Sequence, residues 1–298
     1  MGFLQRLLSL FWVTVSQNEP MSKRTSYGVG GPAKYYVTVY SVKALRDVIE
    51  LCLEYKVNYK IIGNGTNLLF SDKGFDGVVI STKGLNTLRH DKGKIYAMSG
   101  VTLCDLVLFS AEYNLYGGEA LMGIPATVGG AIVMNAGAFG SSLGDFIKSV
   151  TTVKNGKLCV YDKEECEFGY RKSIFLGLGE PIISAEFDFI NVPDGEISKE
   201  LIDKCKNSRK QNQPSGKSCG CVFKNPTGDY AGRIIDQAGL KGFELGRASV
   251  SQKHANFIVT KPGATSSEVY LLIKYIKEKI KSEFNISLQE EVEFVGEF

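Results

Sequence analysis

The sequence predicts an α+β fold divided into two or three subdomains around a ligand cleft. At 298 residues and 32.6 kDa, the chain is longer than one small hydrophobic core usually needs. Segments with the two-residue period of strands alternate with segments that have the 3.6-residue period of helices. Hydrophobic residues make up 44% and charged residues 22%, which is typical of a globular chain with a sizeable core.

Strands and helices are predicted to alternate along the first half of the chain. The run Lys34–Val39 is rich in β-branched and aromatic residues and predicts a strand. Ser41 then precedes apolar residues at helical spacing, which predicts a capped helix over 42–55. The other elements expected here are strands near 59–63, 77–81 and 94–99, and a helix from its cap Thr102 to about Tyr113.

The N-terminal residues Met1–Val15 combine one arginine with a run of apolar side chains. This run is too short to span a bilayer. The residues that follow, Ser16–Pro20, hold no cleavage site of the A-x-A kind. We therefore expect an N-terminal helix that lies on the body of the protein, rather than a signal peptide.

The second half predicts strands first and helices later. The stretch 148–190 is mainly strand-like, and a polar helix is expected at about 197–209. A domain boundary is predicted near 206–218, because Asn207–Lys217 lacks apolar periodicity and holds Pro and Gly. The remaining expected elements are a short helix after Asp229, a long helix opened by the capping box Thr265–Glu268, and a closing strand Val292–Val295. The inner face of the long helix is predicted to carry Val269, Leu272, Ile273, Ile276 and Ile280.

Charge and cysteine content exclude several classes of protein. A net charge of +3, from 35 basic and 32 acidic side chains, is too balanced for a protein that binds nucleic acid or an anionic membrane. Seven scattered cysteines fit a reduced cytoplasmic protein better than a disulfide framework. The Cys219-x-Cys221 pair has no second cysteine pair, and the chain holds only two histidines, so we predict no metal site.

The first glycine-rich segment, Ile61–Leu69, starts like a G-x-G-x-x-G dinucleotide fingerprint. Leu68 replaces the third glycine, and no amphipathic helix follows before Gly77, so the segment is not a Rossmann motif. What remains is a turn of Gly, Asn and Thr whose backbone N–H groups can converge on a pyrophosphate.

The second glycine-rich segment is Gly117–Gly140. Glycines in such number allow positive φ angles or close backbone approach, which favours a surface wrapped against a large flat ligand with phosphates. The alternative is that these glycines only form hairpin turns.

These residues together resemble the UDP-N-acetylenolpyruvoylglucosamine reductases, also called UDP-N-acetylmuramate dehydrogenases. The resemblance runs from about Asn18 to the C-terminus. No long insertion separates Arg171 from Pro181, so the chain is similar to the shorter subtype, which lacks a tyrosine-bearing loop over the substrate. The motifs that carry the resemblance are Asn18–Pro20, Thr25–Ser26, Gly30–Ala33, Ile62–Leu69, Gly123–Gly137, Tyr170–Ser173, Gly220–Pro226, Lys253–Phe257 and Glu291–Val292.

The resemblance implies an FAD-binding domain of the vanillyl-alcohol-oxidase type in two subdomains, followed by an α+β substrate domain. We expect the first subdomain, with the N-terminal helix, at 1–82, the second at 83–205 and the substrate domain at 206–298, its last strand returning to the active site. The implied reaction is the FAD-dependent, NADPH-driven reduction of UDP-N-acetylglucosamine enolpyruvate to UDP-N-acetylmuramate in peptidoglycan synthesis. We expect a cytoplasmic monomer whose FAD is non-covalent, because neither glycine-rich segment contains a His or Cys to form a flavin bond.

The resemblance also implies the site residues. It assigns Arg171 and Glu291 to steadying the carboxylate-bearing intermediate, and Cys221, where the family commonly has a serine, to protonation. A guanidinium can bind a carboxylate through two parallel hydrogen bonds, which suits Arg171. The expected cofactor-binding residues are Ile62, Gly63, Asn64, Gly65, Thr66, Asn67, Leu68, Gly123, Ile124, Pro125, Thr127, Val128, Gly129, Gly130, Asn135 and Gly137. The expected substrate-binding residues are Tyr170, Lys224, Asn225, Arg209 and Arg233.

Each assignment has a plainer structural alternative. Arg171 could form a surface ion pair with Glu164, Glu165 or Glu167. Glu291 could be an exposed edge charge, Cys221 a packed thiol, and the other basic residues a solvated face. For the whole protein, the alternatives are another FAD oxidoreductase of the same fold and a flavin-binding protein without turnover.

Overall fold

The computed structural model describes residues 2–191 and 196–298, which form two compact units. The first unit comprises Met1–Ser16, Tyr35–Asn64 and Gly77–Arg209. The second comprises Gln17–Lys34, Gly65–Asp76 and Lys210–Phe298. Helices and strands are mixed along the chain, as the predicted α+β class requires.

A four-stranded sheet and two helices surround the first hydrophobic core. The strand order is β1 (Val13–Pro20), β2 (Pro32–Val39), β5 (Phe75–Ser81) and β3 (Tyr59–Ile62). The helix α2 (Val42–Glu54) buries one stripe against this core, and the Oγ atom of Ser41 accepts the N–H of Ala44 at 3.1 Å. The predicted helix, its cap and the strands around it are confirmed.

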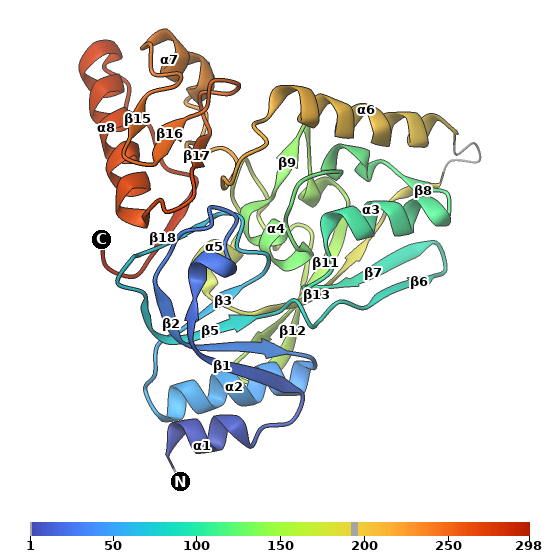
Figure 1. Ribbon diagram of the computed structural model, residues 1–298. Coiled ribbons are helices and arrows are strands. Elements are labelled where there is room, and N and C mark those ends of the chain that lie inside the picture. The colour runs from blue at the N-terminus through green and yellow to red at the C-terminus, as the bar shows by residue number, and fades with distance from the viewer. Residues whose placement is uncertain (1, 192–195) are drawn as a thin grey trace. The chain divides into compact units, whose positions relative to one another are not determined.

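The N-terminal helix is shorter than expected. Helix α1 covers only Phe3–Leu8, and strand β1 already begins at Val13. Leu7 is fully buried, and the ring of Phe3 lies 5.5 Å from Tyr35. The helix therefore lies on the first core beside α2, as predicted (Figure 1). Met1 lies outside the described residues.

An antiparallel five-stranded sheet holds the second core of the first unit. Its order is β12 (Lys157–Asp162), β11 (Ile147–Lys154), β13 (Ile182–Phe187), β7 (Lys94–Met98) and β6 (Leu88–Asp91). Helix α3 (Leu103–Glu112) packs on it, capped by Thr102 as predicted. The smaller elements are β8 (Leu115–Tyr116), β14 (Ile190–Asn191), β9 (Gly137–Ala138), β10 (Ser141–Ser142), the 3-10 helix Leu143–Asp145 and α5 (Phe175–Leu178).

A helix in the second glycine-rich segment was not predicted. The segment folds into the 3-10 helix Gly118–Leu121 and the α-helix α4 (Val128–Met134). Two glycines in one helical turn cost about 1 kcal/mol each relative to alanine, which is why helix propensity argues against it. Burial of Ala131 and Ile132 in the second core overrides that preference.

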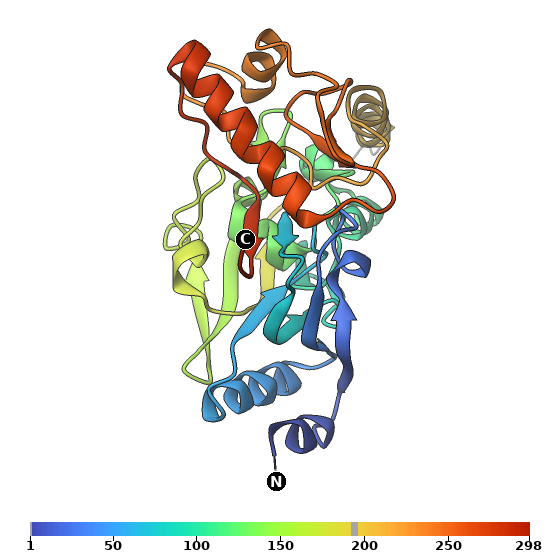
Figure 2. The same cartoon turned by 60° about the vertical axis from the view of Figure 1, so that its left-hand side comes forward.

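The second unit has its own core, formed by strands and two helices. Strand β4 (Leu68–Phe70) pairs in parallel with β18 (Glu293–Val295). The antiparallel strands β15 (Glu244–Leu245), β16 (Ala248–Val250) and β17 (Ile258–Thr260) pack with α8 (Ser266–Phe284), which lies against them as the red helix in Figure 2. The remaining elements are the 3-10 helix Met21–Lys23 and α7 (Ala231–Gln237).

The predicted long helix is confirmed in detail. The Oγ1 atom of Thr265 accepts the N–H of Glu268 at 3.2 Å, and the five predicted inward side chains are fully buried. Asp72, from the loop after β4, also caps this helix, since its carboxylate accepts the N–H groups of Ser266 and Ser267, each at 2.8 Å. Two sets of caps therefore satisfy the N–H groups of the first turn.

The polar helix α6 is longer than predicted. It covers Glu196–Asn212, so the first half of Asn207–Lys217, which lacks apolar periodicity, is helical rather than part of a boundary loop. Arg209, Lys210 and Gln211, which have high helix propensity, help to continue the helix past the end of its apolar face. In the part of the chain that the structure describes, no helix has the length and apolar character that a membrane span needs.

Candidate active site

The first glycine-rich segment contributes Ile62–Asn64 to the first unit. A Cβ atom added at Gly63 would lie 2.1 Å from Oγ1 of Thr127, so only glycine fits there. The side-chain Nδ2 of Asn64 donates to the carbonyl of Pro125 at 2.8 Å. These two contacts bring the beginning of the first segment against the middle of the second, as expected if both segments serve one ligand.

The second unit holds the rest of this segment, Gly65–Asn67. Gly65 has a φ of +66°, and an added Cβ atom would lie 2.2 Å from the carbonyl oxygen of Arg24. The side-chain Nδ2 of Asn67 donates to the carbonyl of Glu291 at 2.8 Å. Asn67 therefore anchors the backbone of a predicted catalytic residue.

The backbone of this segment fits an anionic ligand. Among the residues that the structure describes, none accepts a hydrogen bond from the backbone N–H groups of Asn64, Gly65, Thr66 or Asn67. A run of unpaired N–H donors in a turn is an anion-binding arrangement, because each donor gains a partner when a phosphate binds. The segment is thus compatible with the pyrophosphate of FAD.

The second glycine-rich segment uses its backbone differently. The N–H groups of Val128 and Gly129 donate to the carbonyls of Val101 and Ser99 at 2.7 Å and 2.8 Å. A Cβ atom at Gly129 would lie 2.9 Å from the Cβ of Ser99, so this glycine permits close packing inside the unit. Gly130, in contrast, is exposed, and a Cβ atom added there would have only Oγ1 of Thr127 within 4 Å outside its own helix backbone. Of the pair, Gly130 presents the open face.

Arg209, predicted to bind substrate, lies against the same segment. Its Nε donates to the carbonyl of Met122 at 2.9 Å and its Nη2 to that of Ala120 at 3.2 Å. Its guanidinium also stacks over the ring of Phe139, 5.2 Å from the centroid. These contacts give Arg209 a structural task, to hold the backbone before α4.

Arg171 lies at the tip of a tight turn in the first unit. Gly169 and Lys172 close the turn through two backbone hydrogen bonds of 3.0 Å and 3.1 Å. Arg171 has a φ of 52°, its Nη2 donates to the carbonyl of Gly137 at 3.1 Å, and its guanidinium lies 5.3 Å from the ring centroid of Tyr170. The turn therefore brings the predicted catalytic residue Arg171 to the second glycine-rich segment, with the predicted substrate contact Tyr170 beside it.

Asn135 fastens this turn to the core. It ends α4 with a φ of 43°, and only 4% of it is exposed. Its Nδ2 donates to the carbonyl of Gly169 at 2.9 Å, and its Oδ1 accepts the N–H of Gly144 at 2.9 Å. The hydroxyl of Ser173 adds a bond to the carbonyl of Val133 at 2.7 Å. Asn135 was predicted as a cofactor contact, and no local pattern around it indicates that its amide anchors a distant turn.

Cys221 and Glu291 are brought together in the second unit. Glu291 donates its N–H to the carbonyl of Val222 at 2.7 Å, and Lys224 donates to that of Gln289 at 2.9 Å. Phe223 and Glu290 form an antiparallel bridge between these bonds. The two predicted catalytic residues thus lie on paired extended segments, although 70 positions separate them in the sequence.

The neighbouring Cys219 is a buried thiol. Burial raises its pKa to about 12, and its neighbours include the hydroxyl of Tyr27. None of the seven cysteines, all in the described part of the chain, forms a disulfide. Within the described part of the chain, no cluster of three or more His, Cys, Asp or Glu side chains could hold a metal ion.

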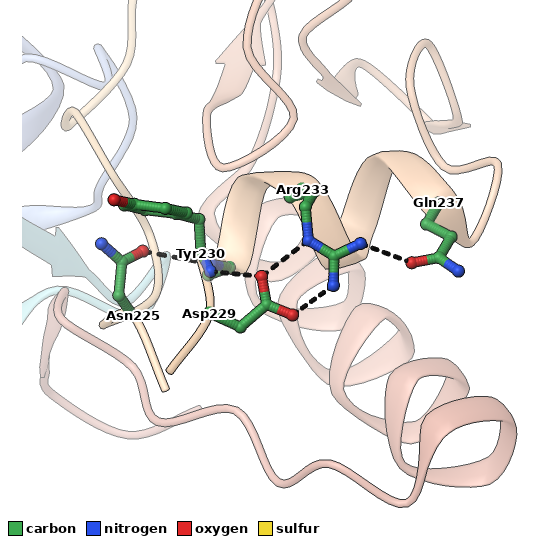
Figure 3. A network of polar contacts seen from close by, with 6 residues as sticks. Asn225, Asp229, Tyr230, Arg233 and Gln237 are labelled. Carbon is green, nitrogen blue, oxygen red and sulfur yellow. Dashed lines mark hydrogen bonds and ion pairs between the residues drawn. The ribbon is translucent and has the colours of Figure 1, made fainter. Parts of the chain in front are cut away.

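Two further predicted substrate contacts, Asn225 and Arg233, lie before and on α7 (Figure 3). The Oδ1 of Asn225 accepts the N–H of Ala231 at 3.1 Å. Arg233 pairs with Asp229, with its Nε 2.7 Å from Oδ1, and donates to Gln237 at 2.8 Å. The bonds from Arg233 and from the N–H of Tyr230 lower the pKa of Asp229 to about 2.

These contacts separate the basic candidates of the second unit. Arg233 already has a carboxylate partner, which an anionic ligand would have to displace. Among the described residues, no carboxylate pairs with the ammonium of Lys224. Lys224 is the better placed of the two to meet a phosphate.

Comparisons with known proteins agree along the chain. The family model described as FAD binding domain matches residues 33–159. The model described as UDP-N-acetylenolpyruvoylglucosamine reductase, C-terminal domain, matches residues 210–295. The second match covers most of the second unit.

Complete relatives match over nearly their whole length. The UDP-N-acetylenolpyruvoylglucosamine reductase of Clostridium perfringens (strain SM101 / Type A) is 38% identical over 286 residues, which cover 95% of this chain and 93% of the relative. The reductase of Carboxydothermus hydrogenoformans is 39% identical over 286 residues, with 95% and 94% covered.

Solved structures support the same assignment. The crystal structure of UDP-N-acetylenolpyruvylglucosamine reductase from Thermus caldophilus has a TM-score of 0.81 at 35% identity, covering 95% of this chain and 99% of its own. Physcomitrella patens BBE-like 1 shares only the fold, with a TM-score of 0.51 at 17% identity over 64% of this chain. The predicted fold class, a vanillyl-alcohol-oxidase type of FAD domain with a C-terminal α+β domain, is confirmed. The chain belongs to the UDP-N-acetylenolpyruvoylglucosamine reductase family.

Proposed function

We propose that the protein reduces UDP-N-acetylglucosamine enolpyruvate to UDP-N-acetylmuramate, a step of peptidoglycan synthesis, with bound FAD and with NADPH as the electron donor. The observation that carries this proposal is the pairing of the Cys221 segment with Glu291 in the second unit. Family membership over 95% of the chain supports the same reaction.

The reaction adds a hydride to one carbon of the enolpyruvyl double bond and a proton to its neighbour. FAD, when bound, supplies the hydride and takes one in turn from NADPH. The residues that would hold FAD are the turn Ile62–Leu68, with its unpaired N–H groups, and the segment Gly123–Gly137, with the open face of Gly130. FAD is held without a covalent bond, since neither segment offers a His or Cys.

Three side chains of the protein carry the remaining chemistry. Arg171 binds the substrate carboxylate, on which negative charge accumulates, through its two-pronged guanidinium. Glu291 assists in polarising and steadying the carboxylate-bearing intermediate. The thiol of Cys221 delivers the proton to carbon, because a neutral thiol is a stronger acid than the serine hydroxyl that the family commonly has.

The substrate contacts follow from the two units. In the first unit, Tyr170 lies beside Arg171, and Arg209 holds the backbone at Met122. In the second unit, Lys224, Asn225 and Arg233 offer donors to the sugar nucleotide. We assign 1–82 and 83–205 to the two FAD subdomains and 206–298 to the substrate domain.

We place the protein in the cytoplasm as a monomer that binds no nucleic acid and contributes to cell shape and division through the cell wall. The small net charge of +3 and the free cysteines support this. Light scattering on the purified protein measures its mass in solution and tests whether it is a monomer.

Anaerobic spectroscopy tests the reaction. We expect the purified protein to carry a flavin spectrum that acid releases as free FAD. NADPH should bleach the absorbance of the protein-bound flavin, and UDP-N-acetylglucosamine enolpyruvate should restore that absorbance. Bleaching without restoration would indicate an oxidoreductase with another substrate, and a flavin that NADPH does not bleach would indicate a binding protein without turnover.

A further inference from the structure

The motif Lys253–Phe257 belongs to the resemblance but has no part in the proposed reaction. Within it, Asn256 is only 2% exposed. Its side-chain Oδ1 accepts the N–H of Phe223 at 2.9 Å, and its Nδ2 donates to the carbonyl of Phe223 at 2.8 Å. One amide side chain thus makes both hydrogen bonds that a neighbouring strand would make to Phe223.

The Cys221 segment is therefore held on two sides. Residues 289–292 pair with one side, through Glu291 to Val222 and Lys224 to Gln289. Asn256 pairs with the other side, and its own carbonyl accepts the N–H of Val222 at 2.8 Å. The two proposed catalytic residues are joined through a segment whose free edge Asn256 closes.

Asn256 is itself fixed by its neighbours. The ring Nδ1 of His254 accepts the N–H of Asn256 at 3.2 Å. The hydroxyl oxygen of Ser251 accepts the N–H groups of Lys253 and His254 at 3.1 Å and 3.3 Å. Gly232 of α7 lies close by, since an added Cβ atom would be 3.6 Å from the Cβ of Asn256. The motif is a hydrogen-bonded turn that directs the side-chain amide of Asn256 to the backbone of Phe223.

We propose that Asn256 is a positioning residue, which fixes Cys221 and Glu291 relative to each other through Phe223 and Val222. The proposal rests on the proposed reduction of the enolpyruvyl substrate. Proton delivery requires the thiol to lie within hydrogen-bond reach of the carbon, and a shift of about 1 Å costs on the order of 100-fold in rate. Hydride transfer from NADPH does not use either group.

The variant Asn256→Asp separates positioning from folding. A neutral aspartic acid keeps both bonds, because its O–H donates to the carbonyl of Phe223 and its other oxygen accepts the N–H. An ionised aspartate has two acceptors, one of which faces that carbonyl and repels it. Protonation of the introduced carboxyl therefore restores the hydrogen bond to the carbonyl of Phe223, without any further change of sequence.

The surroundings determine the pH at which the repair occurs. Burial disfavours the aspartate charge and raises the pKa of such a carboxyl. Burial also lowers the pKa of His254, which disfavours a positive charge on this ring beside Asn256. The other charged or titratable groups on the elements around Asn256 are Lys253 on its own turn, Cys221 and Lys224 on the paired segment, Glu290 and Glu291 on the C-terminal segment, Arg233 and Asp236 on α7, and Lys241 near His254.

Rapid-mixing kinetics on the FAD-loaded full chain give the test. At about pH 8, Asn256→Asp should reoxidise with substrate about 10- to 100-fold more slowly than the wild type. The ratio of the two rates should rise toward one as the pH falls toward about 5.5. Flavin reduction by NADPH should match the wild type throughout.

Two variants serve as controls. Asn256→Leu removes both bonds at every pH, so its deficit should not depend on pH. Asn285→Asp makes the same amide-to-acid change at an exposed helix end and should follow the wild type. If Asn256→Leu does not fold, the pH series of Asn256→Asp still tests whether Asn256 positions the two catalytic residues.

Three results would overturn the proposal. Asn256→Asp could reoxidise as fast as the wild type at all pH values, or its deficit could be the same at pH 5.5 and pH 8. Asn256→Asp could also lose equally in flavin reduction by NADPH and in reoxidation by the substrate. A wild type that NADPH reduces but the substrate does not reoxidise would instead refute the proposed function.

Discussion

The turn that carries Arg171 and the segment that carries Cys221 are built in different ways. The Arg171 turn is fastened by side chains, because Asn135 and Ser173 bond to the backbone around it and the residue itself has a φ of 52°. The Cys221 segment is held by backbone pairing with residues 289–292 on one side and by Asn256 on the other. None of these bonds uses the side chain of Cys221, so the segment should tolerate a change of the reacting group itself. The turn should be sensitive to the side chains of Asn135 and Ser173, which anchor it.

The largest effect is expected from Cys221→Ala. Because the segment keeps its backbone pairing, the loss should be purely chemical. Reoxidation of the flavin by substrate should fall about 100- to 10,000-fold, while reduction by NADPH stays unchanged. Stopped-flow absorbance under anaerobic conditions measures both rates. Unchanged reoxidation would show that another group donates the proton.

The matched variant Cys221→Ser should retain substantial turnover. A thiolate has no proton to give, so wild-type reoxidation should decline once the pH is high enough to ionise the Cys221 thiol. The serine variant should lack this decline. The same decline in both proteins would assign it to a different group.

Arg171→Lys should have a smaller but selective effect. The charge survives, but the two-pronged geometry is lost, and hydrogen bonds to charged groups contribute about 1.5 to 3 kcal/mol. Reoxidation should therefore slow about 10- to 100-fold, with little change in reduction by NADPH. Equal damage to both half-reactions would point to a defect in folding or FAD binding.

Asn135 tests the claim that the Arg171 turn depends on its anchors. Asn135→Gly keeps the positive φ but leaves the N–H of Gly144 without a partner, and it leaves the carbonyl of Gly169 with only its bond from Lys172. An unpaired buried group costs about 1 to 3 kcal/mol and a lost hydrogen bond about 0.5 to 1.5 kcal/mol, so the free energy of unfolding should fall by a few kcal/mol. Urea unfolding measures this. The free energy of unfolding should fall further in Asn135→Ala, because an alanine disfavours a backbone φ of 43°.

The smallest effect is expected at Asp72, which belongs to neither region. Partial burial alone would raise the pKa of Asp72, but the hydrogen bonds from Ser267 and Ser266 outweigh it and lower the pKa below the ordinary 3.8. The carboxylate therefore stabilises the protein above pH 3.8, and this contribution disappears as the pH falls through the lowered pKa.

Asp72→Asn should accordingly cost about 0.5 to 1 kcal/mol at pH 7 and progressively less in acid. Thermal unfolding across pH 2.5–7 measures the difference from the wild type. Both half-reactions should be unaffected at pH 7. A difference that stays constant down to the most acidic pH would contradict the capping role.

The sequence by itself determined the regular elements whose signals are local. Ser41, Thr102 and Thr265 each precede a helix at a spacing that lets the hydroxyl accept the N–H three residues on, so these helix starts were predictable. Leu68 in place of the third glycine correctly excluded the helix of a Rossmann motif after the first glycine-rich segment; the strand β4 found there was not predicted. The resemblance supplied the family, the cofactor and the site residues.

Tertiary structure alone decided how those residues are used. Helix α4 forms although two glycines open it, because burial in the second core outweighs propensity. The amides of Asn135, Asn67 and Asn256 reach backbone groups 34, 224 and 33 positions away. A side-chain amide bonds whichever backbone group the fold brings within about 3 Å, and no local pattern in the sequence encodes that partner.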